Sequence, residues 1–528
     1  MSSLRRAAAY RPTRPETAVF VSGVASMGLE ILAGRLIAPQ FGSSIYTWGT
    51  IIGVFLAALS YGYWRGGKAA AERASLGRLS RLFTLTAAYV VVLVVAGDLL
   101  LRSTTAFPLP SRMASLPAVA VLFGPPTYLL GYVSPYAAQL SEKRETGAAS
   151  GHVYAVGTIG SIVGAFATTY FLIPSLDTDL IALVFGLLSV ATAVALAYPV
   201  RIRGEAGKAL LVGLLLVAAP VAGTAGITVE GRVVYETETA YQELQVVDAG
   251  DERTLYLDGQ RHSAMDLSDP DRHVFTYTRY FHLPFLYTDD IDRVLFVGGG
   301  GFTGPKRFLD EYPNVTVDVV EIDPEVVRVA REYFRVPDSP RLNVHVGDGR
   351  QFLRDTDRTY DLIVLDAYRQ DKVPFQLTTR QFMELTRERL DSDGILFANV
   401  IAAPSGPASD FYRAQYRTVR TVYPQVYTYP TVGGAFVQNI ELVATANDER
   451  VPLETLRERN AAGAANIDLS AELDSHTAEA PPTDDVPVLR DDRAPVDSLL
   501  DPLVGQRYVV QRTNATNTTN TTTATATA

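Results

Sequence analysis

The sequence predicts an N-terminal bundle of membrane-spanning helices followed by an α/β domain with a parallel, doubly wound sheet. Two observations predict this division. Before about residue 227, apolar stretches recur, each near the ~20 residues that cross a bilayer, whereas charged residues occur throughout the remainder. From residue 292 onward, short apolar runs alternate with amphipathic helical patterns, which is typical of strand and helix units around a parallel sheet. At 528 residues the chain is long enough for two or three domains.

Apolar stretches in the first part of the chain predict about seven membrane spans. We place them at about 16–38, 46–64, 82–101, 117–140, 153–174, 178–199 and 208–227. The first is too long for a secretory signal and lacks a small-residue cleavage site, so it should remain in the mature protein. Gly157, Gly160 and Gly164 in the fifth span predict a surface for close helix packing. We therefore expect residues 1–227 to cross a lipid bilayer, the cell membrane, several times.

Basic residues cluster at alternate ends of the predicted spans. Arg5, Arg6, Arg11 and Arg14 precede the first, and further basic residues follow the second, fourth and sixth. By the positive-inside rule these ends are cytoplasmic, and an odd number of spans then puts the C-terminus outside. Asn514, Asn517 and Asn520 begin glycosylation triplets in a Thr-rich tail, although such triplets also arise from composition alone. A miscounted span, such as the fourth with Pro125-Pro126, would reverse the orientation, so the side of the C-terminal domain stays open.

Composition excludes several classes of function. The net charge is -10, and the C-terminal part is markedly acidic, which argues against a nucleic-acid partner because phosphate binding needs clustered basic residues. Cysteine is absent, so disulfides and thiolate metal sites are excluded. The six histidines show no metal-ligand spacing, and we predict no metal site.

The C-terminal part divides into four segments. Residues 228–290 predict a small antiparallel β domain that leads into a helix from about Asp271 to Tyr287. Residues 291–450 predict a Rossmann-like domain, in which 412–445 supplies closing antiparallel strands. Residues 451–511 predict a loop and tail segment, in which 460–495 is a loop. Residues 512–528 predict a disordered Thr-rich tail. Within the Rossmann-like domain we expect strands at 293–297, 316–321, 342–346, 361–366 and 394–400, and helices around 304–311, 324–334, 349–354 and 379–390.

A glycine turn and an acid mark a nucleoside site. Gly298, Gly299 and Gly300 follow the first strand, where glycine lets the backbone approach a ligand closely. Glu321 ends the next strand, and a carboxylate in this position of a Rossmann-type domain can accept both hydroxyls of a ribose. A helix-capping or surface role for Glu321 is the alternative, and the strand, turn and helix context favours binding.

Two further acids follow the third and fourth strands. Asp348, next to Gly349, suits a loop beside an adenine amine, with a turn aspartate as the alternative. Asp366 could orient or deprotonate an amine nucleophile, or instead cap the next helix or pair with Arg369. Because parallel strands end at one edge of a sheet, Glu321, Asp348 and Asp366 should converge on one crevice.

These motifs resemble a known family. Gly-Gly-Gly, Val-Glu-Ile-Asp, Gly-Asp-Gly and Tyr-Asp-Leu-Ile-Val-Leu-Asp, in this order, are similar to the spermidine synthases (polyamine aminopropyltransferases), which share the class I methyltransferase fold. Tyr241-Gln242 and Leu257-Asp258-Gly259 resemble their small β domain. Residues 28–48 and 131–136 are similar to multi-pass membrane proteins that carry a fused spermidine synthase-like domain.

The resemblance implies aminopropyl transfer to a small-molecule amine, with decarboxylated S-adenosylmethionine or S-adenosylmethionine as the cofactor, and leaves a homodimer open. It implies that Asp366 is the catalytic base and that the cofactor is bound by Gln242, Gly298, Gly299, Gly300, Glu321, Asp348 and Gly349. The alternatives are an S-adenosylmethionine-dependent methyltransferase and a non-catalytic sensor or transporter for an adenosyl ligand.

The chain departs from the family where the amine should bind. Gly301-Phe302 stands where the family keeps an acid, Tyr277-Thr278-Arg279 replaces a Tyr-His-Glu triplet, and His262 replaces a glutamine. The motifs on the nucleotide side therefore match, whereas those on the polyamine side do not.

Overall fold

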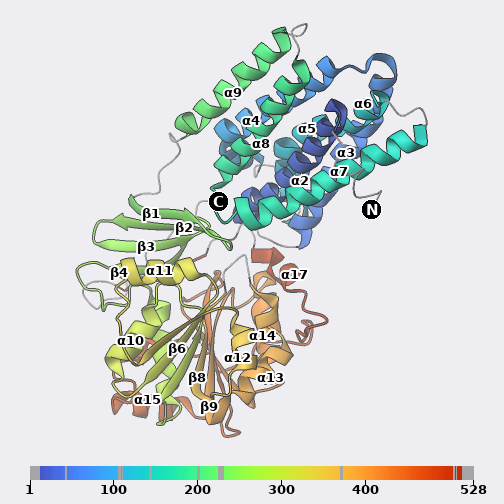
Figure 1. Ribbon diagram of the computed structural model, residues 1–528. Coiled ribbons are helices and arrows are strands. Elements are labelled where there is room, and N and C mark those ends of the chain that lie inside the picture. The colour runs from blue at the N-terminus through green and yellow to red at the C-terminus, as the bar shows by residue number, and fades with distance from the viewer. Residues whose placement is uncertain are drawn as a thin grey trace, which may run out of the picture. The chain divides into compact units, whose positions relative to one another are not determined.

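The computed structural model describes residues 12–41, 45–104, 109, 111–141, 146–198, 203–223, 231–368, 373–503, 506 and 508–513 (Figure 1). The chain divides into two compact units, Met1–Ile227 and Thr228–Ala528. The predicted glycosylation triplets, most of the basic N-terminal residues and Arg369 lie outside the described residues.

The first unit is built from long helices. They are α2 (Arg14–Phe41), α3 (Ile45–Arg73), α4 (Leu76–Thr104), α5 (Ser115–Gly131), α6 (Val133–Gln139), α7 (Thr146–Ala167) with a π-helical end η2 (Thr168–Leu172), α8 (Thr178–Ala197) and α9 (Arg203–Gly223), with the short η1 (Ser111–Met113) before α5. In the described part, six stretches are long and apolar enough to cross a membrane, with α5 and α6 forming one of them. The seventh predicted span, 208–227, overlaps α9 as far as Gly223. Its last residues, 224–227, lie outside the described residues.

Glycines bring α2 and α7 into backbone contact. A Cβ on Gly160 would lie 2.2 Å from the carbonyl oxygen of Phe20, and one on Gly164 would lie 2.4 Å from that of Val24. Gly23 makes the reciprocal contact, since its Cβ would lie 2.2 Å from the oxygen of Gly157. The glycine packing surface predicted from the sequence is therefore present, and a larger side chain there would separate the helices.

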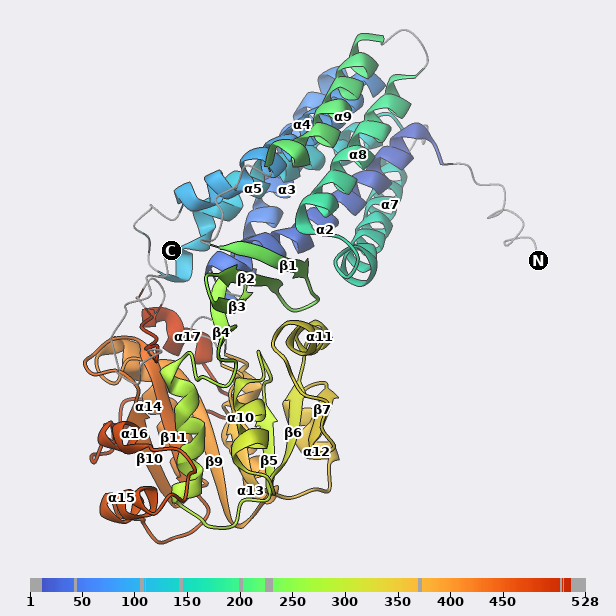
Figure 2. The ribbon, with the colours of Figure 1, turned by 90° about the vertical axis from the view of Figure 1, so that its left-hand side faces the viewer.

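The second unit begins with a four-stranded antiparallel sheet. Its strands follow chain order: β1 (Arg232–Glu238), β2 (Glu243–Ala249), β3 (Glu252–Leu257) and β4 (Gln260–Asp266). Apolar side chains of the sheet pack on helix α11 (Pro324–Tyr333), which Figure 2 shows beside the sheet. Leu244, Val246, Leu255 and Met265 from the sheet form one core with Val326 and Val329 of α11 and with Phe334.

A seven-stranded sheet forms the centre of the second unit, in the order β10-β11-β9-β8-β5-β6-β7. The five strands from β9 to β7 are parallel, and β10 and β11 pair antiparallel at the other edge. Their bounds are β5 (Arg293–Val297), β6 (Thr316–Glu321), β7 (Leu342–Val346), β8 (Tyr360–Leu365), β9 (Leu390–Ala402), β10 (Gln425–Pro430) and β11 (Gln438–Thr445). Each strand of the predicted Rossmann-like domain is present within a few residues, so the predicted fold class is confirmed.

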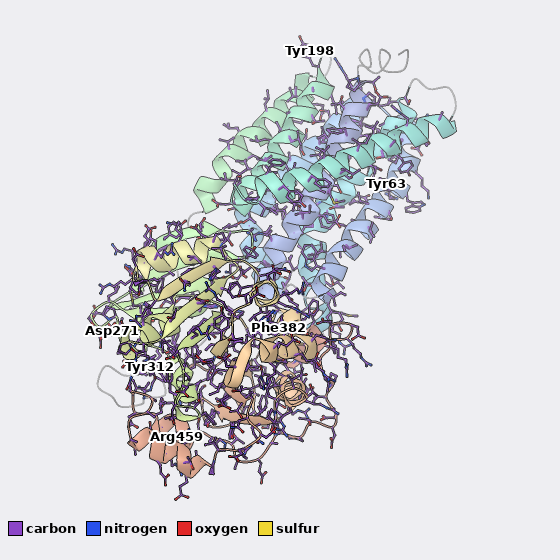
Figure 3. All side chains as sticks on the ribbon, turned by 60° about the horizontal axis from the view of Figure 1, so that its bottom comes forward. Tyr63, Tyr198, Asp271, Tyr312, Phe382 and Arg459 are labelled. Carbon is purple, nitrogen blue, oxygen red and sulfur yellow. The ribbon has the colours of Figure 1, made fainter. Side chains whose placement is uncertain are left out.

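Two apolar cores cover the two faces of this sheet. One contains residues of α12 (Gly349–Asp355), α13 (Arg380–Glu388), α14 (Asp410–Arg420) and α17 (Val496–Leu500). The other contains residues of the 3-10 helix η3 (Thr276–Leu286), α10 (Thr303–Glu311), α11, α15 (Leu453–Ala461) and α16 (Ser470–Asp474). Figure 3 labels Phe382 from the first core and Tyr312 from the second. Short 3-10 turns η4 (Phe375–Leu377), η5 (Pro407–Ser409) and η6 (Asp501–Leu503) complete the described elements.

The structure corrects several sequence-based boundaries. The predicted loop 460–495 contains the end of α15 and all of α16, and Leu469 and Leu473 are buried in the core. These helices are too short for a clear period. The helix predicted from Asp271 to Tyr287 is the shorter 3-10 helix η3, and residues 412–420, predicted as strand, belong to α14. At the start of the predicted disordered tail, Arg512 pairs with Glu252 at 3.0 Å and Thr513 is also described.

We predict that the Arg341 side chain stabilises this unit through its hydrogen bonds to the backbone. Its guanidinium donates to the carbonyl oxygens of Val315, Tyr312 and Leu309 at 3.0, 3.0 and 2.7 Å. Arg341→Ala should destabilise the unit by about 1.5–3 kcal/mol, because hydrogen bonds from a charged donor are lost. Hydrogen exchange of the full chain, followed in peptides over β6 and β7, should show faster exchange. Arg457→Ala, which removes an exposed ion pair with Asp474, should leave exchange in these peptides nearly unchanged, and equal effects of the two variants would contradict this role.

Candidate active site

Four parallel strands end at one edge of the large sheet and bring the predicted acids together. The Gly298 N–H donates to the Val320 carbonyl at 2.9 Å, and the Asp366 N–H donates to that of Val297 at 3.0 Å. The Gly347 N–H donates to the Glu321 carbonyl at 2.9 Å, which carries Asp348 to the same edge. Ligands bind at this edge in open α/β sheets.

Glu321 organises the glycine turn with its carboxylate. Oε2 accepts from the N–H groups of Gly299 at 2.8 Å and Gly300 at 3.4 Å, and Oε1 accepts from that of Asp323 at 3.0 Å. Burial raises the pKa of Glu321, while these backbone donors oppose the rise. The capping alternative is wrong for Glu321, because Asp323 caps α11 by accepting from the Glu325 N–H. Three bonds leave the carboxylate with acceptor capacity for a hydroxyl.

The glycines are required by close approach as well as by conformation. Gly298 has φ +100°, and a Cβ there would lie 2.4 Å from the carbonyl oxygen of Asp366. Gly300 has φ +48°, and its Cβ would lie 3.0 Å from the His262 ring. A side chain at Gly349 would meet Val297 at 2.5 Å, so this glycine lets α12 pack on β5.

The small sheet carries Gln242 to the β6 end of the site. The Thr239 hydroxyl donates to Asp323 Oδ2 at 2.6 Å and accepts from the Gln242 N–H at 3.1 Å. Asp323 lies two residues after Glu321, so the turn that holds Gln242 is tied to the strand end that holds Glu321. The predicted cofactor contact of Gln242 stays a prediction.

Asp348 has a structural partner in this structure. Its carboxylate caps α12 by accepting from the Gln351 N–H at 2.8 Å. This local role of Asp348 corresponds to the alternative of a turn aspartate. The predicted contact of Asp348 with an adenine amine stays a prediction. Two apolar side chains that the sequence analysis did not single out lie nearby: Ile322 is 41% exposed and Val346 is 55% exposed, each directly at a strand end. Their signal in the sequence was an apolar residue at the last position of a strand or directly after it.

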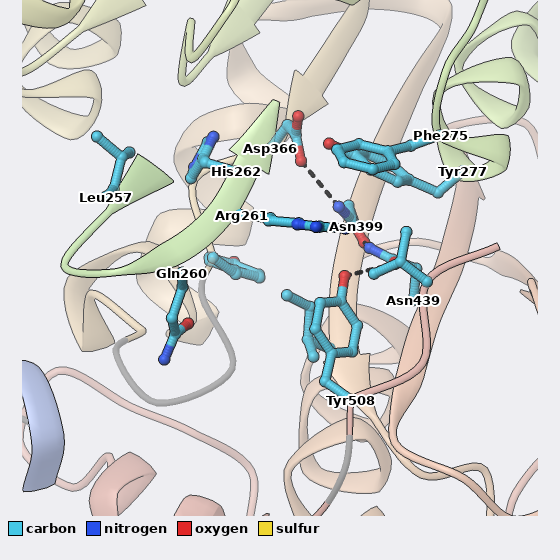
Figure 4. A pocket seen from close by; sticks show the side chains of 13 residues that line it. Leu257, Gln260, Arg261, His262, Phe275, Tyr277, Asp366, Asn399, Asn439 and Tyr508 are labelled. Carbon is cyan, nitrogen blue, oxygen red and sulfur yellow. Dashed lines mark hydrogen bonds between the residues drawn. The ribbon is translucent and has the colours of Figure 1, made fainter. Parts of the chain in front are cut away.

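Asp366 lies in the wall of a cavity of about 40 Å³ (Figure 4). The β3–β4 hairpin supplies Leu257 and His262, and Tyr277 comes from η3. Asn399 of β9, Asn439 of β11 and Tyr508 of the C-terminal segment also line the cavity.

A chain of hydrogen bonds holds the Asp366 carboxyl. Asn399 Nδ2 donates to Asp366 Oδ1 at 2.8 Å, and Asn439 Nδ2 donates to Asn399 Oδ1 at 2.8 Å. The Tyr508 hydroxyl donates to Asn439 Oδ1 at 2.6 Å (Figure 4). Burial raises the pKa of Asp366 to about 6, while the Asn399 amide acts in the opposite direction. A carboxyl with this pKa is mostly ionised at neutral pH and can still take up a proton.

The two amides in this series of hydrogen bonds were not predicted from the sequence. Asn399 and Asn439 lie inside buried strands, where an uncharged polar residue between apolar neighbours was the available signal. Asp366 does not cap a helix among the described residues, and Arg369, its other proposed partner, lies outside them.

The residues that depart from the family pattern lie in different surroundings. The Phe302 ring packs in the core that contains η3 and α10, so that Phe302 is only 1% exposed. Its backbone has φ +57°. Tyr277 faces the cavity, whereas Thr278 hydrogen-bonds His273 and Arg279 pairs with Glu472. The acid that the family keeps after its glycines is therefore replaced by a core side chain.

We predict that Glu321 is required for nucleoside binding. Glu321→Ala removes the acceptor for a ribose hydroxyl and leaves the N–H groups of Gly299 and Gly300 without this partner. Calorimetry of the purified full chain with methylthioadenosine should show affinity reduced by at least about 100-fold, since each hydrogen bond to a charged group contributes ~1.5–3 kcal/mol. Glu332→Ala, an exposed acid on α11, serves as the matched control. Unchanged affinity in Glu321→Ala would refute the assignment.

Comparison with known proteins agrees with this geometry. Residues 275–440 match the family model described as spermine/spermidine synthase domain. A polyamine aminopropyltransferase of Vibrio vulnificus is 31% identical over 208 residues, which are 38% of this chain and 68% of the relative. One of Chromobacterium violaceum is 31% identical over 173 residues, or 32% of this chain and 65% of the relative. The crystal structure of a probable spermidine synthase from Corynebacterium glutamicum has a TM-score of 0.38 at 22% identity, covering 44% of this chain and 87% of that one. The chain therefore belongs to the polyamine aminopropyltransferase family, and its C-terminal unit carries a transferase domain of the spermidine synthase type.

Proposed function

We propose that the C-terminal unit transfers an aminopropyl group from decarboxylated S-adenosylmethionine to a small-molecule amine. The observation that carries this proposal is the position of Asp366. Its carboxyl borders a cavity and lies one strand away from the glycine turn that Glu321 organises. A proton acceptor beside a nucleoside site is the arrangement that amine alkylation requires.

The residues at the strand ends fit an adenosyl donor. Gly298 and Gly300 leave room against the backbone, and Glu321 has acceptor capacity for a ribose hydroxyl. The exposed faces of Ile322 and Val346 offer an apolar surface for a planar base.

The donor, when bound, supplies a carbon next to its sulfonium, to which the amine nitrogen bonds as the carbon–sulfur bond breaks and methylthioadenosine leaves with the electron pair. Asp366 accepts the proton that the amine nitrogen loses. Asn399 holds the carboxyl in place through Oδ1 and leaves Oδ2 for the amine. Tyr277 and Tyr508 line the cavity in which the nucleophile would lie.

We predict that transfer depends on an ionised Asp366. The rate of transfer at low substrate concentration should fall as the pH drops through about 6, the pKa of the free enzyme's Asp366, because the protonated carboxyl accepts no proton. Asp366→Asn should reduce transfer by about 10²–10⁴-fold, the usual contribution of a general base. The measurement is mass spectrometry of methylthioadenosine and aminopropylated amine as a function of pH.

Methylthioadenosine binding provides the control, since Asp366→Asn should leave it within about threefold of the wild type if the carboxyl acts only on the amine. Binding without product in both proteins would favour a sensor. Methylated product from S-adenosylmethionine would favour the methyltransferase alternative.

We further propose that residues 1–227 cross the cell membrane several times. Six stretches in the described part have the length and composition for this. Helix α9 also carries exposed apolar side chains, among which Leu214 is 67% exposed, as expected for contact with lipid. With α9 crossing as a seventh span, the positive-inside rule puts the C-terminal unit outside.

The absence of cysteine makes this topology directly testable. Asp289→Cys, on the surface of the C-terminal unit, should react with a membrane-impermeant maleimide in intact cells. Ser75→Cys, in the basic turn between α3 and α4, should react only after permeabilisation. The reverse result for Asp289→Cys would show that α9 does not cross the membrane and that the unit is cytoplasmic.

A further inference from the structure

Glycines bring the end of helix α3 against α5, in a part of the first unit that the proposed reaction does not use. A Cβ on Gly62 would lie 2.5 Å from the carbonyl oxygen of Tyr128, and one on Gly66 would lie 2.9 Å from the Cα atom of Tyr132. Small residues allow such close packing of helices in membrane proteins. The side chains beside these glycines on α3 therefore lie next to those of α5.

Four aromatic residues at this contact form one group, the Trp64 cluster. The Tyr61 ring stacks on Trp64 and on Tyr128, with ring centroids 5.8 and 5.3 Å apart. The rings of Tyr128 and Tyr132 meet edge to face at 5.1 Å. Tyr61 and Trp64 are each 54% exposed, so the cluster reaches the surface of the unit. Trp64 ends the predicted span 46–64, and Tyr and Trp favour this boundary between acyl chains and headgroups.

Two basic side chains join the Trp64 cluster. The Arg65 guanidinium hydrogen-bonds the hydroxyls of Tyr132 and Tyr128. The Lys68 ammonium lies 4.0 Å from the centre of the Trp64 ring, where the ring attracts a cation. Both residues follow directly after the apolar part of α3. The end of this helix therefore carries two positive charges on an aromatic surface.

These two cations lack the acidic partners that other basic residues of the unit have. Arg81 and Lys208 share Glu205, at 2.9 and 3.2 Å. Among the residues that the structure describes, neither Arg65 nor Lys68 has a carboxylate partner. The positive charge of the Trp64 cluster is therefore not neutralised within the described part of the unit.

The tyrosine hydroxyls add a further donor. Tyr128 and Tyr132 hydrogen-bond each other at 2.5 Å, so that one hydroxyl donates to the other. Arg65 has no acceptor atom, so the O–H proton of the second tyrosine has no partner within this group. A guanidinium, an ammonium and an O–H group are thus present together. Such a set of donors suits a phosphate.

We propose that the Trp64 cluster, with Arg65 and Lys68, binds the phosphate of an anionic phospholipid. This inference rests on the proposed membrane crossing of residues 1–227. The two cations would neutralise the phosphate, and the exposed rings of Tyr61 and Trp64 would contact the glycerol and the first methylene groups. The positive-inside rule puts this end of α3 on the cytoplasmic side, where anionic lipids attract basic side chains next to a span.

Fluorescence quenching of Trp64 tests the inference. The chain has only two tryptophans, Trp48 and Trp64, so the full chain with Trp48→Phe carries one reporter, which lies in the cluster. This variant is placed in nanodiscs of phosphatidylcholine that contain a small, equal fraction of brominated phosphatidylglycerol or brominated phosphatidylcholine. Phosphatidylglycerol should bind beside Trp64 at least about tenfold more tightly, because choline compensates the phosphate charge of the other lipid.

Matched variants separate a site from general attraction. Arg65→Gln together with Lys68→Gln should bring the preference close to one, and Arg65→Lys, which keeps the charge but not the planar fork, should retain part of it. Arg73→Gln, on the same helix and 68% exposed, should keep the full preference. Inorganic phosphate should not compete, because it lacks acyl chains. Native mass spectrometry of the wild type, which keeps Trp48, makes the same comparison by counting retained lipids.

The outcomes separate this inference from the proposed membrane crossing. Equal quenching by the two brominated lipids supports the membrane crossing and overturns the lipid site. A preference that survives in the double variant, or that is lost equally in Arg73→Gln, also overturns the site. Competition by inorganic phosphate would show that the cluster binds free phosphate and not a lipid. Absence of quenching by either lipid refutes both the site and a membrane position for this end of α3.

Discussion

A hydrogen-bond chain from Tyr508 through Asn439 and Asn399 to Asp366 holds the reactive carboxyl at the end of β8. It joins two parallel strands, one antiparallel strand and the C-terminal segment. The end of β8 also determines which residue the turn after β5 can contain, because only glycine at position 298 fits against the Asp366 backbone. The placement of the proton acceptor and the shape of the nucleoside site therefore depend on one set of contacts.

The two principal acids have different surroundings and hence different roles. Three backbone N–H groups hold Glu321, which suits a fixed acceptor for hydroxyl groups. Asp366 has one amide donor and faces a cavity, and its pKa of about 6 suits proton transfer. Different surroundings commonly give two carboxyl groups in one active site different pKa values. One group then binds the substrate, and the other takes part in acid–base catalysis.

Much of this arrangement could be predicted from local patterns. Apolar runs that end in Gly298, Glu321 and Asp366 predicted both the parallel sheet and its binding edge. Asn399 and Asn439 could not be predicted, because their importance comes from register between strands far apart in the sequence. The short helix α16 was missed since its contacts with the core, and not its own period, make it helical.

The most direct test is to supply the full chain with equal amounts of decarboxylated S-adenosylmethionine and S-adenosylmethionine, together with 1,4-diaminobutane, and to quantify all products. We predict methylthioadenosine and aminopropylated diamine in a one-to-one ratio, with no S-adenosylhomocysteine. Release of S-adenosylhomocysteine with a methylated amine, or no release of either nucleoside, would show that the chain does not transfer an aminopropyl group.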